Sequence, residues 1–249
     1  MEQEKVIQIK DLKVYYKKNN SYLRGKNRHM VIKGISLDVY EGEILGIAGE
    51  SGCGKSTLAK AIVGMNKEID GEIIQKYSDA QMVFQDPYSS LNPKKKIGWL
   101  LKEPLKVDRY KKWTSEEMEQ RAKEIMQAIG LPLELLDRYP SQLSGGQRQR
   151  VSIGVALMRS PKVLIADEPV SALDVTIQAQ ILELLRTLHK EMGITILFIS
   201  HDLRVIYQLC DHVAVMNGGI IKEYGVPKEI YRRPKSEYTM ELLKAAGIR

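Results

Sequence analysis

Short runs of apolar residues, either consecutive or alternating with polar ones, dominate the start of the chain. The runs are VIQIKDLKVYY (6–16), VIKGISLDVY (31–40) and EILGIAG (43–49). Runs of this length that are rich in β-branched residues are typical of strands. The polar stretch 17–30 between the first two carries lysines and arginines but no acid. We therefore expect an exposed hairpin loop with solvated charges there rather than a binding site.

Three segments show the helical period instead. Apolar residues recur at helical spacing in STLAKAIVGM (56–65), SEEMEQRAKEIMQAIG (115–130) and TIQAQILELLRTLHKEM (176–192). Either Thr114 or Ser115 is suited to cap the second of these helices. Strand patterns nearly vanish between about 88 and 160, which predicts a separate helical subdomain.

Strand patterns return in the last third of the chain. They are KVLIAD (162–167), ITILFIS (194–200) and HVAVMNGGII (212–221). A helical pattern lies between the first two, and strand, helix and strand at this spacing predict a right-handed parallel crossover. The elements together indicate an α/β fold.

Composition narrows the function classes. With 249 residues, of which 43% are hydrophobic, the chain can build a sizeable core, and its two cysteines are too few for a disulfide framework. No apolar run approaches the roughly 20 residues of a membrane span, and the N-terminus lacks a signal-peptide pattern, so we expect a cytosolic protein or one on a cytosolic membrane face. The net charge of +7 arises from 38 basic and 31 acidic residues. This modest excess does not favour a nucleic-acid partner.

The stretch GIAGESGCGKST (46–57) carries the clearest chemistry. Gly49, Gly54, Lys55 and Ser56 match the pattern G-x-x-x-x-G-K-[ST], placed between a strand and a helix. Its glycines let backbone N–H groups converge on phosphate oxygens, its lysine reaches the β and γ phosphates, and Ser56 would ligate Mg²⁺. The alternative is a purely structural glycine turn. The expected ATP-binding residues of the loop are Gly49, Glu50, Ser51, Gly52, Cys53, Gly54, Lys55, Ser56 and Thr57, with Cys53 as a small packing residue.

Two acids follow the strand KVLIAD. Asp167 lies where an open parallel sheet binds ligands and could hold the Mg²⁺ shell. Glu168 is a second carboxylate beside it and could polarise an attacking water. The alternative is an acid pair that faces solvent.

A second bare helix start is predicted in QLSGGQRQRVSIGVALMRSP (142–161). Ser144, Gly145 and Gly146 directly precede a helical pattern, and such an N-terminus suits a phosphate. One chain therefore carries two ends that are suited to phosphate.

These stretches resemble the ATP-binding cassette (ABC) ATPases. GESGCGKST looks like Walker A, VFQDP the Q-loop, LSGGQ the signature, LIADEP Walker B, SALD the D-loop and ISHD the switch histidine, in the order of the family. The resemblance implies a P-loop NTPase fold, with a RecA-like parallel sheet, an antiparallel β subdomain and a helical subdomain. We expect a single ATPase domain over 1–249. Its parts would be a nucleotide-binding core (1–87 and 161–225), a helical signature subdomain (88–160) and a C-terminal helix (226–249).

The resemblance also assigns roles. Tyr16 resembles the aromatic residue that stacks on adenine, with Tyr15 or an ordinary strand tyrosine as alternatives. Gln85 would touch Mg²⁺ and the attacking water, and His201 the γ-phosphate. Asp174 would lie at a dimer seam. The residues implied to face the ATP of a partner are Ser144, Gly145, Gly146 and Gln147.

The family has three kinds of function, of which transport fits best. The members that remodel DNA insert a long coiled coil before the signature, and those that act on ribosomes normally carry two cassettes, whereas this chain has one cassette and only a short segment before its signature. Transport implies separate membrane subunits. A soluble ABC ATPase that acts with ribosomes or DNA remains the alternative.

Two further stretches resemble the peptide/nickel importer branch. They are VFQDPYSSLNPKKKIGWLLKEPL and GVPKEIYRRPKSEYTMELLKAA. Because no cysteine-rich tail follows, the compact importers of nickel or metal chelates, including the metallophore type, are the closer resemblance. The resemblance implies ATP and Mg²⁺ as ligands and a place on the cytoplasmic face of the membrane.

The same branch implies partners. These are two integral-membrane permease subunits, a second ABC ATPase and, indirectly, an extracellular substrate-binding protein. A heterodimer of ATPases is favoured and a homodimer stays open. We expect the region from about 86 to 105 to receive a permease helix. Its candidate apolar contacts are Tyr88, Leu91 and Trp99, each of which could equally belong to the local core.

Overall fold

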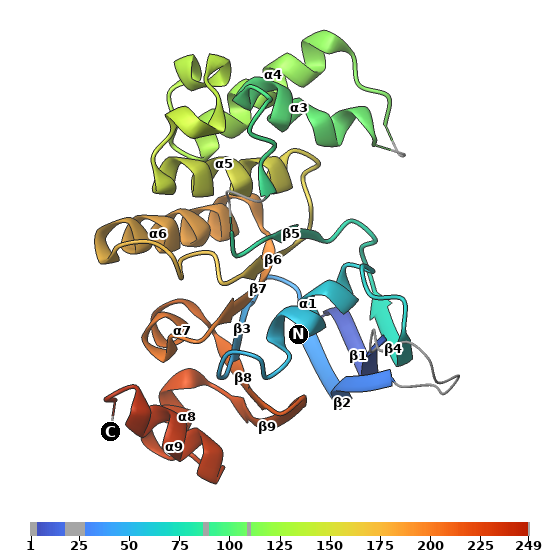
Figure 1. Cartoon of the computed structure of the whole chain (residues 1–249), viewed down its shortest axis with the longest axis vertical. Helices are drawn as coiled ribbons and strands as arrows, with labels where there is room; N and C mark the ends of the chain where they lie inside the picture. Colours follow the sequence, from blue (N-terminus) through green and yellow to red (C-terminus); the bar gives the residue numbers. More distant parts are fainter. Residues whose placement is uncertain (1–3, 18–27, 87–89, 109–110, 249) are drawn as a thin grey trace, which may run out of the picture. The chain divides into compact units, whose positions relative to one another are not determined.

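The computed structural model describes residues 4–17, 28–86, 90–108 and 111–248. The chain forms two compact parts, shown in Figure 1. We call Met1–Ser78 together with Thr195–Arg249 the first part, and Asp79–Ile194 the second part. Among the described residues, no helix is long and apolar enough to cross a bilayer.

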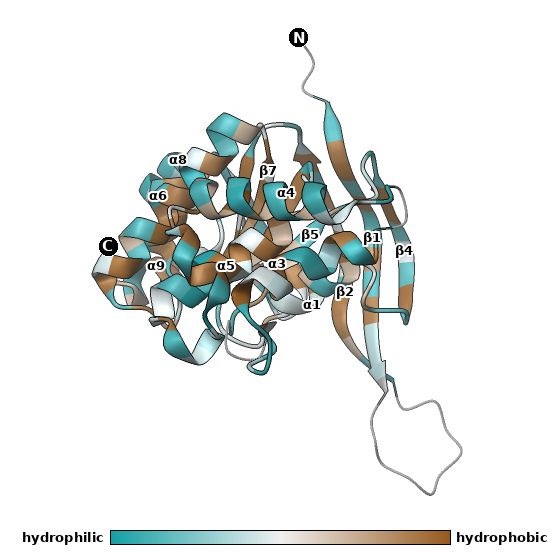
Figure 2. Cartoon of the chain, turned by 90° about the horizontal axis from the view of Figure 1, so that it is seen from above, coloured by the Kyte–Doolittle hydropathy of each residue, from teal (hydrophilic) through white to brown (hydrophobic). Residues whose placement is uncertain are grey.

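The first part begins with an antiparallel sheet. Strand β1 (Lys5–Lys17) lies between β2 (Arg28–Tyr40) and β4 (Ile69–Gln75). Residues alternate between buried and more exposed along β1, as expected for a sheet with one covered face. Figure 2 shows hydrophobic residues in brown and hydrophilic residues in teal along β1. The sequence predicted the first two strands but not β4.

A parallel group of strands forms the rest of the first part's core. Strand β3 (Ile44–Ala48) pairs in parallel with both β7 (Thr195–Ser200) and β8 (His212–Asn217). Every residue of β3 and β7 is buried, which explains their continuous apolar sequence. The helices of this part are α1 (Lys55–Ile62), α7 (Leu203–Leu209), α8 (Pro227–Arg232) and α9 (Glu237–Ala245).

Two segments differ from the sequence prediction. The run HVAVMNGGII is not one strand, because Gly218 and Gly219 adopt φ of 54° and 85° and turn the chain from β8 into the antiparallel β9 (Ile220–Gly225). The C-terminal segment contains two helices instead of one. Pro234 disfavours helical backbone at Arg233, whose φ of −142° separates α8 from α9.

The second part is mostly helical. Strand β5 (Gln81–Val83) pairs in parallel with β6 (Val163–Asp167). The helices are α3 (Ile97–Lys106), α4 (Ser115–Ala128), α5 (Gly145–Leu157) and α6 (Val175–Met192), with short 3₁₀ turns at Leu133–Asp137 and Pro140–Gln142. Thr114, rather than Ser115, caps α4: its hydroxyl accepts from the N–H of Glu117, and the Glu117 carboxylate accepts from the N–H of Thr114.

The motif-based boundaries and the contacts group some residues differently. Residues 79–87 and 161–194 were expected in the nucleotide-binding core, and in the structure the described residues among them (79–86 and 161–194) group with the helical segment. The expected boundaries stay a prediction.

Candidate nucleotide-binding site

The loop between β3 and α1 is built around three glycines with positive φ. Gly49, Gly52 and Gly54 have φ of 152°, 82° and 112°. A Cβ on Gly49 would lie 2.3 Å from the carbonyl oxygen of Met216, so no side chain fits there. The loop leads into helix α1, whose N-cap residue Gly54 has no side chain to cap the first backbone N–H groups. Backbone N–H groups at such a start are suited to phosphate oxygens.

Lys55 places its charge inside this loop. Its side chain is only 4% exposed, and its Nζ donates to the carbonyl oxygens of Gly49 at 2.8 Å and Glu50 at 3.0 Å. Ser56 and Thr57 follow in the first turn of α1 and are half-buried. The loop thus combines a held cation, a serine hydroxyl and backbone donors, which is the chemistry that a nucleoside triphosphate requires.

Cys53 is part of the loop's packing. Burial raises the pKa of its thiol above the ordinary value, so the group is neutral at neutral pH. Its carbonyl oxygen accepts from the N–H of Gly219 at 3.0 Å, which attaches the loop to the turn between β8 and β9. This environment supports its interpretation as a packing residue rather than a nucleophile.

The register of the parallel strands brings His201 to the same edge as the loop. Ser200 on β7 pairs with Ala48 on β3, so His201 and Gly49 each come one residue after paired positions. The His201 side chain is exposed. The carboxyl ends of parallel strands are where open α/β sheets bind ligands.

Tyr16 is linked to the first turn of α1 by hydrogen bonds through the Asn66 side chain. It is 41% exposed, and its hydroxyl donates to the Asn66 side-chain oxygen at 3.4 Å, while the Asn66 amide donates to the carbonyl oxygen of Thr57 at 3.2 Å. The alternative, Tyr15, has its ring beside the guanidinium of Arg28 at 6.0 Å. The exposed ring of Tyr16 is therefore the better candidate for adenine. The sequence did not single out Asn66.

The second part joins Gln85 to Glu168. Strands β5 and β6 run in parallel with Val83 opposite Ala166, so both residues follow neighbouring strand ends. The Gln85 amide donates to a Glu168 carboxylate oxygen at 3.2 Å. Glu168 is 8% exposed and has a φ of 47°, a left-handed conformation that is uncommon outside glycine. A buried carboxylate on a residue with a strained backbone, at the end of a strand, is typical of a functional site.

Asp167 and Asp174 flank this turn. Asp167 ends β6 and is 4% exposed. Asp174 caps α6 and accepts from the N–H of Ile177 at 3.0 Å. The structure therefore gives Asp174 a role within the chain, and its expected place at a dimer seam stays a prediction.

The stretch LSGGQ starts α5. Ser144 caps the helix: its hydroxyl accepts from the N–H of Gln147 at 3.3 Å, and the Gln147 side chain accepts from the N–H of Ser144 at 2.9 Å. A Cβ on Gly146 would lie 2.6 Å from Cγ2 of Ile177 on α6. Close packing of α5 on α6 thus requires this glycine, while Ser144 stays exposed.

The structure brings the predicted residues together in two groups. The phosphate loop, Tyr16 and His201 belong to the first part, and Gln85, Asp167, Glu168, Asp174 and the signature residues belong to the second. The residues expected to hold Mg²⁺ are Ser56 of the first part and Gln85 and Asp167 of the second, and this expectation stays a prediction. Their hydroxyl, amide and carboxylate oxygens are the donors that this ion prefers.

One further contact to the loop was missed at the sequence level. The backbone N–H of Glu50 donates to the hydroxyl of Tyr238 on α9 at 3.2 Å. Tyr238 lies in the stretch SEYTMELL, whose sequence resembles one branch of the family. Nothing in that pattern indicates which element the ring contacts.

Comparison with known proteins shows which family the chain resembles. A family profile described as "ABC transporter" matches residues 32–171. The oligopeptide transport ATP-binding protein OppF of Lactococcus lactis (strain IL1403) is 40% identical over 96% of this chain and 80% of its own length. OppF of Escherichia coli (strain K12) is 42% identical over 98% of this chain and 78% of its own length. The dipeptide transport ATP-binding protein DppF of Escherichia coli (strain K12) is 39% identical over 98% of this chain and 77% of its own length.

Solved structures show the same fold. CbiO1 from Clostridium perfringens, part of the ABC transporter complex CbiONQ, superposes with a TM-score of 0.78 at 28% identity, covering 99% of this chain and 96% of its own. A dimeric post-hydrolysis structure of the ATP-binding cassette MJ0796 bound to ADP and Pi gives a TM-score of 0.76 at 28% identity, covering 89% of this chain and 98% of its own. These similarities confirm the predicted P-loop fold class.

Proposed function

Because the chain belongs to the ABC transporter family of ATP-binding proteins, we propose that it is an ATP-hydrolysing subunit of an ABC importer whose pore is formed by separate membrane proteins. The observation that carries this proposal is the similarity to peptide-import ATPases at about 40% identity over nearly the whole chain. It does not favour the alternative of a soluble ATPase that acts with ribosomes or DNA.

The residues of the two parts divide the reaction between them. Lys55 and the backbone N–H groups at the start of α1 bind the β and γ phosphates, and Tyr16 offers its exposed ring to adenine. Glu168 polarises the attacking water, with Gln85 holding its carboxylate through the observed hydrogen bond. His201 contacts the γ-phosphate from the end of β7.

Mg²⁺ supplies neutralisation of the phosphate charge when it is bound. The Ser56 hydroxyl would hold it from the first part, and Gln85 and Asp167 from the second. Asp167 ends β6 and is buried, and its carboxylate oxygens are the kind of ligand that Mg²⁺ prefers.

The substrate class follows from the relatives. Their names describe oligopeptide and dipeptide transport, so we propose a peptide importer. The narrower expectation of nickel or a metal chelate has no such support and stays a prediction. The proposed partners are two permease subunits, a second ABC ATPase and, through the permeases, an extracellular binding protein, with this chain on the cytoplasmic face of the membrane.

Purification from membranes in mild detergent tests the proposal. We expect two permeases and a second ATPase to accompany the tagged chain, and cells that lack the chain to lose uptake of a labelled peptide. Recovery of ribosomal or DNA-associated proteins instead of permeases would contradict transport. If uptake of nickel is lost while peptide uptake persists, the peptide assignment is wrong.

A variant of the loop separates nucleotide binding from association with the permeases. Lys55→Ala removes the cation nearest the phosphates, so we expect nucleotide affinity to fall about ten- to a hundredfold while the same permeases still accompany the chain. Unchanged nucleotide affinity, measured by titration with a fluorescent ATP analogue, would contradict the role given to Lys55.

A further inference from the structure

We propose that Tyr238 is a positioning residue for the phosphate loop: its hydroxyl holds the backbone of Glu50, so that helix α9 sets the affinity of the loop for nucleotide phosphates. The inference rests on the proposed function of the loop in binding ATP. It adds a role for the C-terminal segment, which the chemistry described above leaves unused.

The contact fixes the exposed tip of the loop. Glu50, Ser51 and Gly52 are exposed, whereas Cys53 and Gly54 are buried. The Glu50 carbonyl oxygen accepts from the N–H of Cys53 at 3.3 Å and from Lys55 Nζ at 3.0 Å, both within the loop itself. The Tyr238 hydroxyl then accepts from the N–H of Glu50 at 3.2 Å, and this bond reaches the loop from another element.

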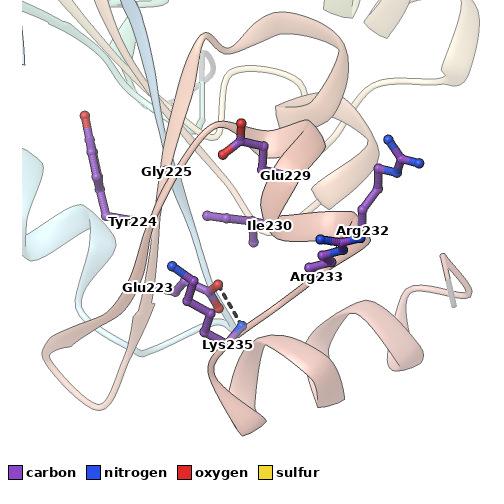
Figure 3. A pocket seen from close by; sticks show the side chains of 8 residues that line it. All are labelled: Glu223, Tyr224, Gly225, Glu229, Ile230, Arg232, Arg233 and Lys235. Atoms are coloured by element: carbon purple, nitrogen blue, oxygen red, sulfur yellow. Dashed lines mark hydrogen bonds between the residues drawn. The ribbon is translucent and has the colours of Figure 1, made fainter.

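Helix α9 is a firm support for that hydroxyl. The Glu223 carboxylate on β9 accepts from the N–H of Lys235 at 2.9 Å and of Ser236 at 3.1 Å, which holds the start of the helix; Figure 3 shows the bond to Lys235. An anion at a helix N-terminus also stabilises the helix dipole. At the other end, Arg204 Nη2 donates to the carbonyl oxygen of Ala246 at 3.0 Å.

The middle of α9 packs into the first part. Thr239 and Leu243 are almost completely buried, at 1% and 0% exposed. The preceding helix α8 is fixed separately, because the Tyr231 hydroxyl donates to the carbonyl oxygen of Leu203 at 2.7 Å. A tyrosine carried by a helix fixed at its start, middle and end can restrain the backbone that it contacts.

The ionisation state of Tyr238 suits this role. Partial burial raises the pKa of its phenol, with the Glu50 N–H bond acting in the opposite direction. The hydroxyl therefore stays neutral at neutral pH, and one of its lone pairs accepts the hydrogen bond from the Glu50 N–H. Holding the loop before nucleotide arrives removes part of the ordering cost of binding.

The test compares two tyrosines of the C-terminal segment. Tyr238→Phe keeps the ring and removes the bond to the loop, and Tyr231→Phe removes a bond between α8 and α7 instead. We expect Tyr238→Phe to raise the Kd for ATP and ADP about three- to tenfold, which is the range of one neutral hydrogen bond. Hydrogen exchange at the Glu50 amide should become faster. Tyr231→Phe should lower the melting temperature and leave both Kd values unchanged.

Enzyme kinetics give a second readout. In the assembled transporter, Tyr238→Phe should raise KM for ATP with kcat unchanged, because the hydroxyl does not touch the reacting atoms. An unchanged Kd in Tyr238→Phe, or an equal loss in Tyr231→Phe, would overturn the positioning role. If the wild-type chain itself fails to bind ATP, the proposed function falls and the inference with it, an outcome distinct from either of these.

Discussion

Glu168 has a left-handed backbone conformation that the sequence does not predict. Its φ of 47° is costly for a non-glycine residue, by about 1–3 kcal/mol. The turn that follows holds it there, because both the N–H and the hydroxyl of Ser171 donate to its carbonyl oxygen, at 3.3 Å and 3.1 Å. With the backbone in this conformation, a Glu168 carboxylate oxygen accepts from the Gln85 amide at 3.2 Å. The proposed role of this carboxylate is to polarise the attacking water.

Replacing Glu168 with Gln tests this role. The substitution keeps the size of the side chain and removes the basic oxygen, so we expect ATP binding to persist while turnover falls by about 10² to 10⁴. The measurement is ATP hydrolysis by the assembled transporter alongside nucleotide binding. Glu183→Gln on α6, which alters an exposed ion pair with Arg186, is the control and should keep normal turnover. Normal hydrolysis by Glu168→Gln would show that another group activates the water.

Residue types in the sequence predicted the phosphate loop well but not its supports. The spacing of Gly49, Gly54 and Lys55 is a local signal, and the positive φ values of the glycines follow from it. Asn66 and Tyr238 contact the site region from distant positions through single hydrogen bonds. No periodicity records such contacts, so they become visible only when the chain is folded.

At the scale of elements, segments with a clear apolar pattern were predicted and segments without one were not. Helices α4 and α6 follow from their apolar spacing, and in α4 the buried positions Ala122, Ile125 and Met126 lie on one face. Strand β5 has three residues and α3 contains Pro104, so neither carries a clear pattern. Their conformation is determined by packing within the second part.

The contact between α5 and α6 gives a prediction at this scale. Gly146→Ala would place a Cβ 2.6 Å from Ile177 Cγ2, so we expect the chain to lose about 1–3 kcal/mol of stability. Ile177→Ala removes that methyl group and should restore much of the loss in the double variant. The free energy of unfolding, from denaturant titration of the four proteins, measures this coupling. Additive losses in the double variant would show that Gly146 is required for another reason.

The structure distinguishes among the three candidate permease contacts in the region 86–105. Leu91 is 3% exposed and belongs to the core of the second part, which favours its alternative interpretation as a core residue over a permease contact. Tyr88 lies outside the described residues. Trp99 is partly exposed, with the ammonium groups of Lys95 and Lys106 at 4.7 Å and 5.1 Å from its ring centre.

Trp99 is therefore the residue to test for coupling. Trp99→Glu should reduce peptide uptake several-fold while ATP affinity of the isolated chain is unchanged, because Trp99 and the phosphate loop belong to different compact parts of the chain. Leu133→Glu, a charge introduced at another partly exposed position of the second part, is the control. Wild-type uptake by Trp99→Glu, or cross-links from the permease to a different surface, would contradict the assignment.

On the scale of the whole molecule, each compact part carries one helix start suited to phosphate. The loop 49–54 precedes α1 in the first part, and Ser144 caps α5 in the second. A γ-phosphate bound at one start needs donors opposite it to complete its coordination. The family resemblance places those donors on a second ATPase, so ATP would lie between two subunits. Closing such a pair removes the phosphates from water and strengthens every charge-assisted contact.

This arrangement predicts that the chain cannot complete its active site alone. We expect the purified chain to be largely monomeric and slow, with ATP hydrolysis rising steeply and cooperatively when the second ATPase is added. Light scattering gives the oligomeric state, and the hydrolysis rate as a function of concentration gives the dependence on pairing.

Substituting Ser144 with Arg should abolish the gain in hydrolysis without changing ATP affinity of the single chain, since Ser144 would act on the ATP of the partner. Full, non-cooperative activity from a dilute monomer would refute the shared site. A stable self-dimer that restores normal transport would remove only the need for a second kind of ATPase, because the loop, Glu168 and the α5 start are all present in this one chain.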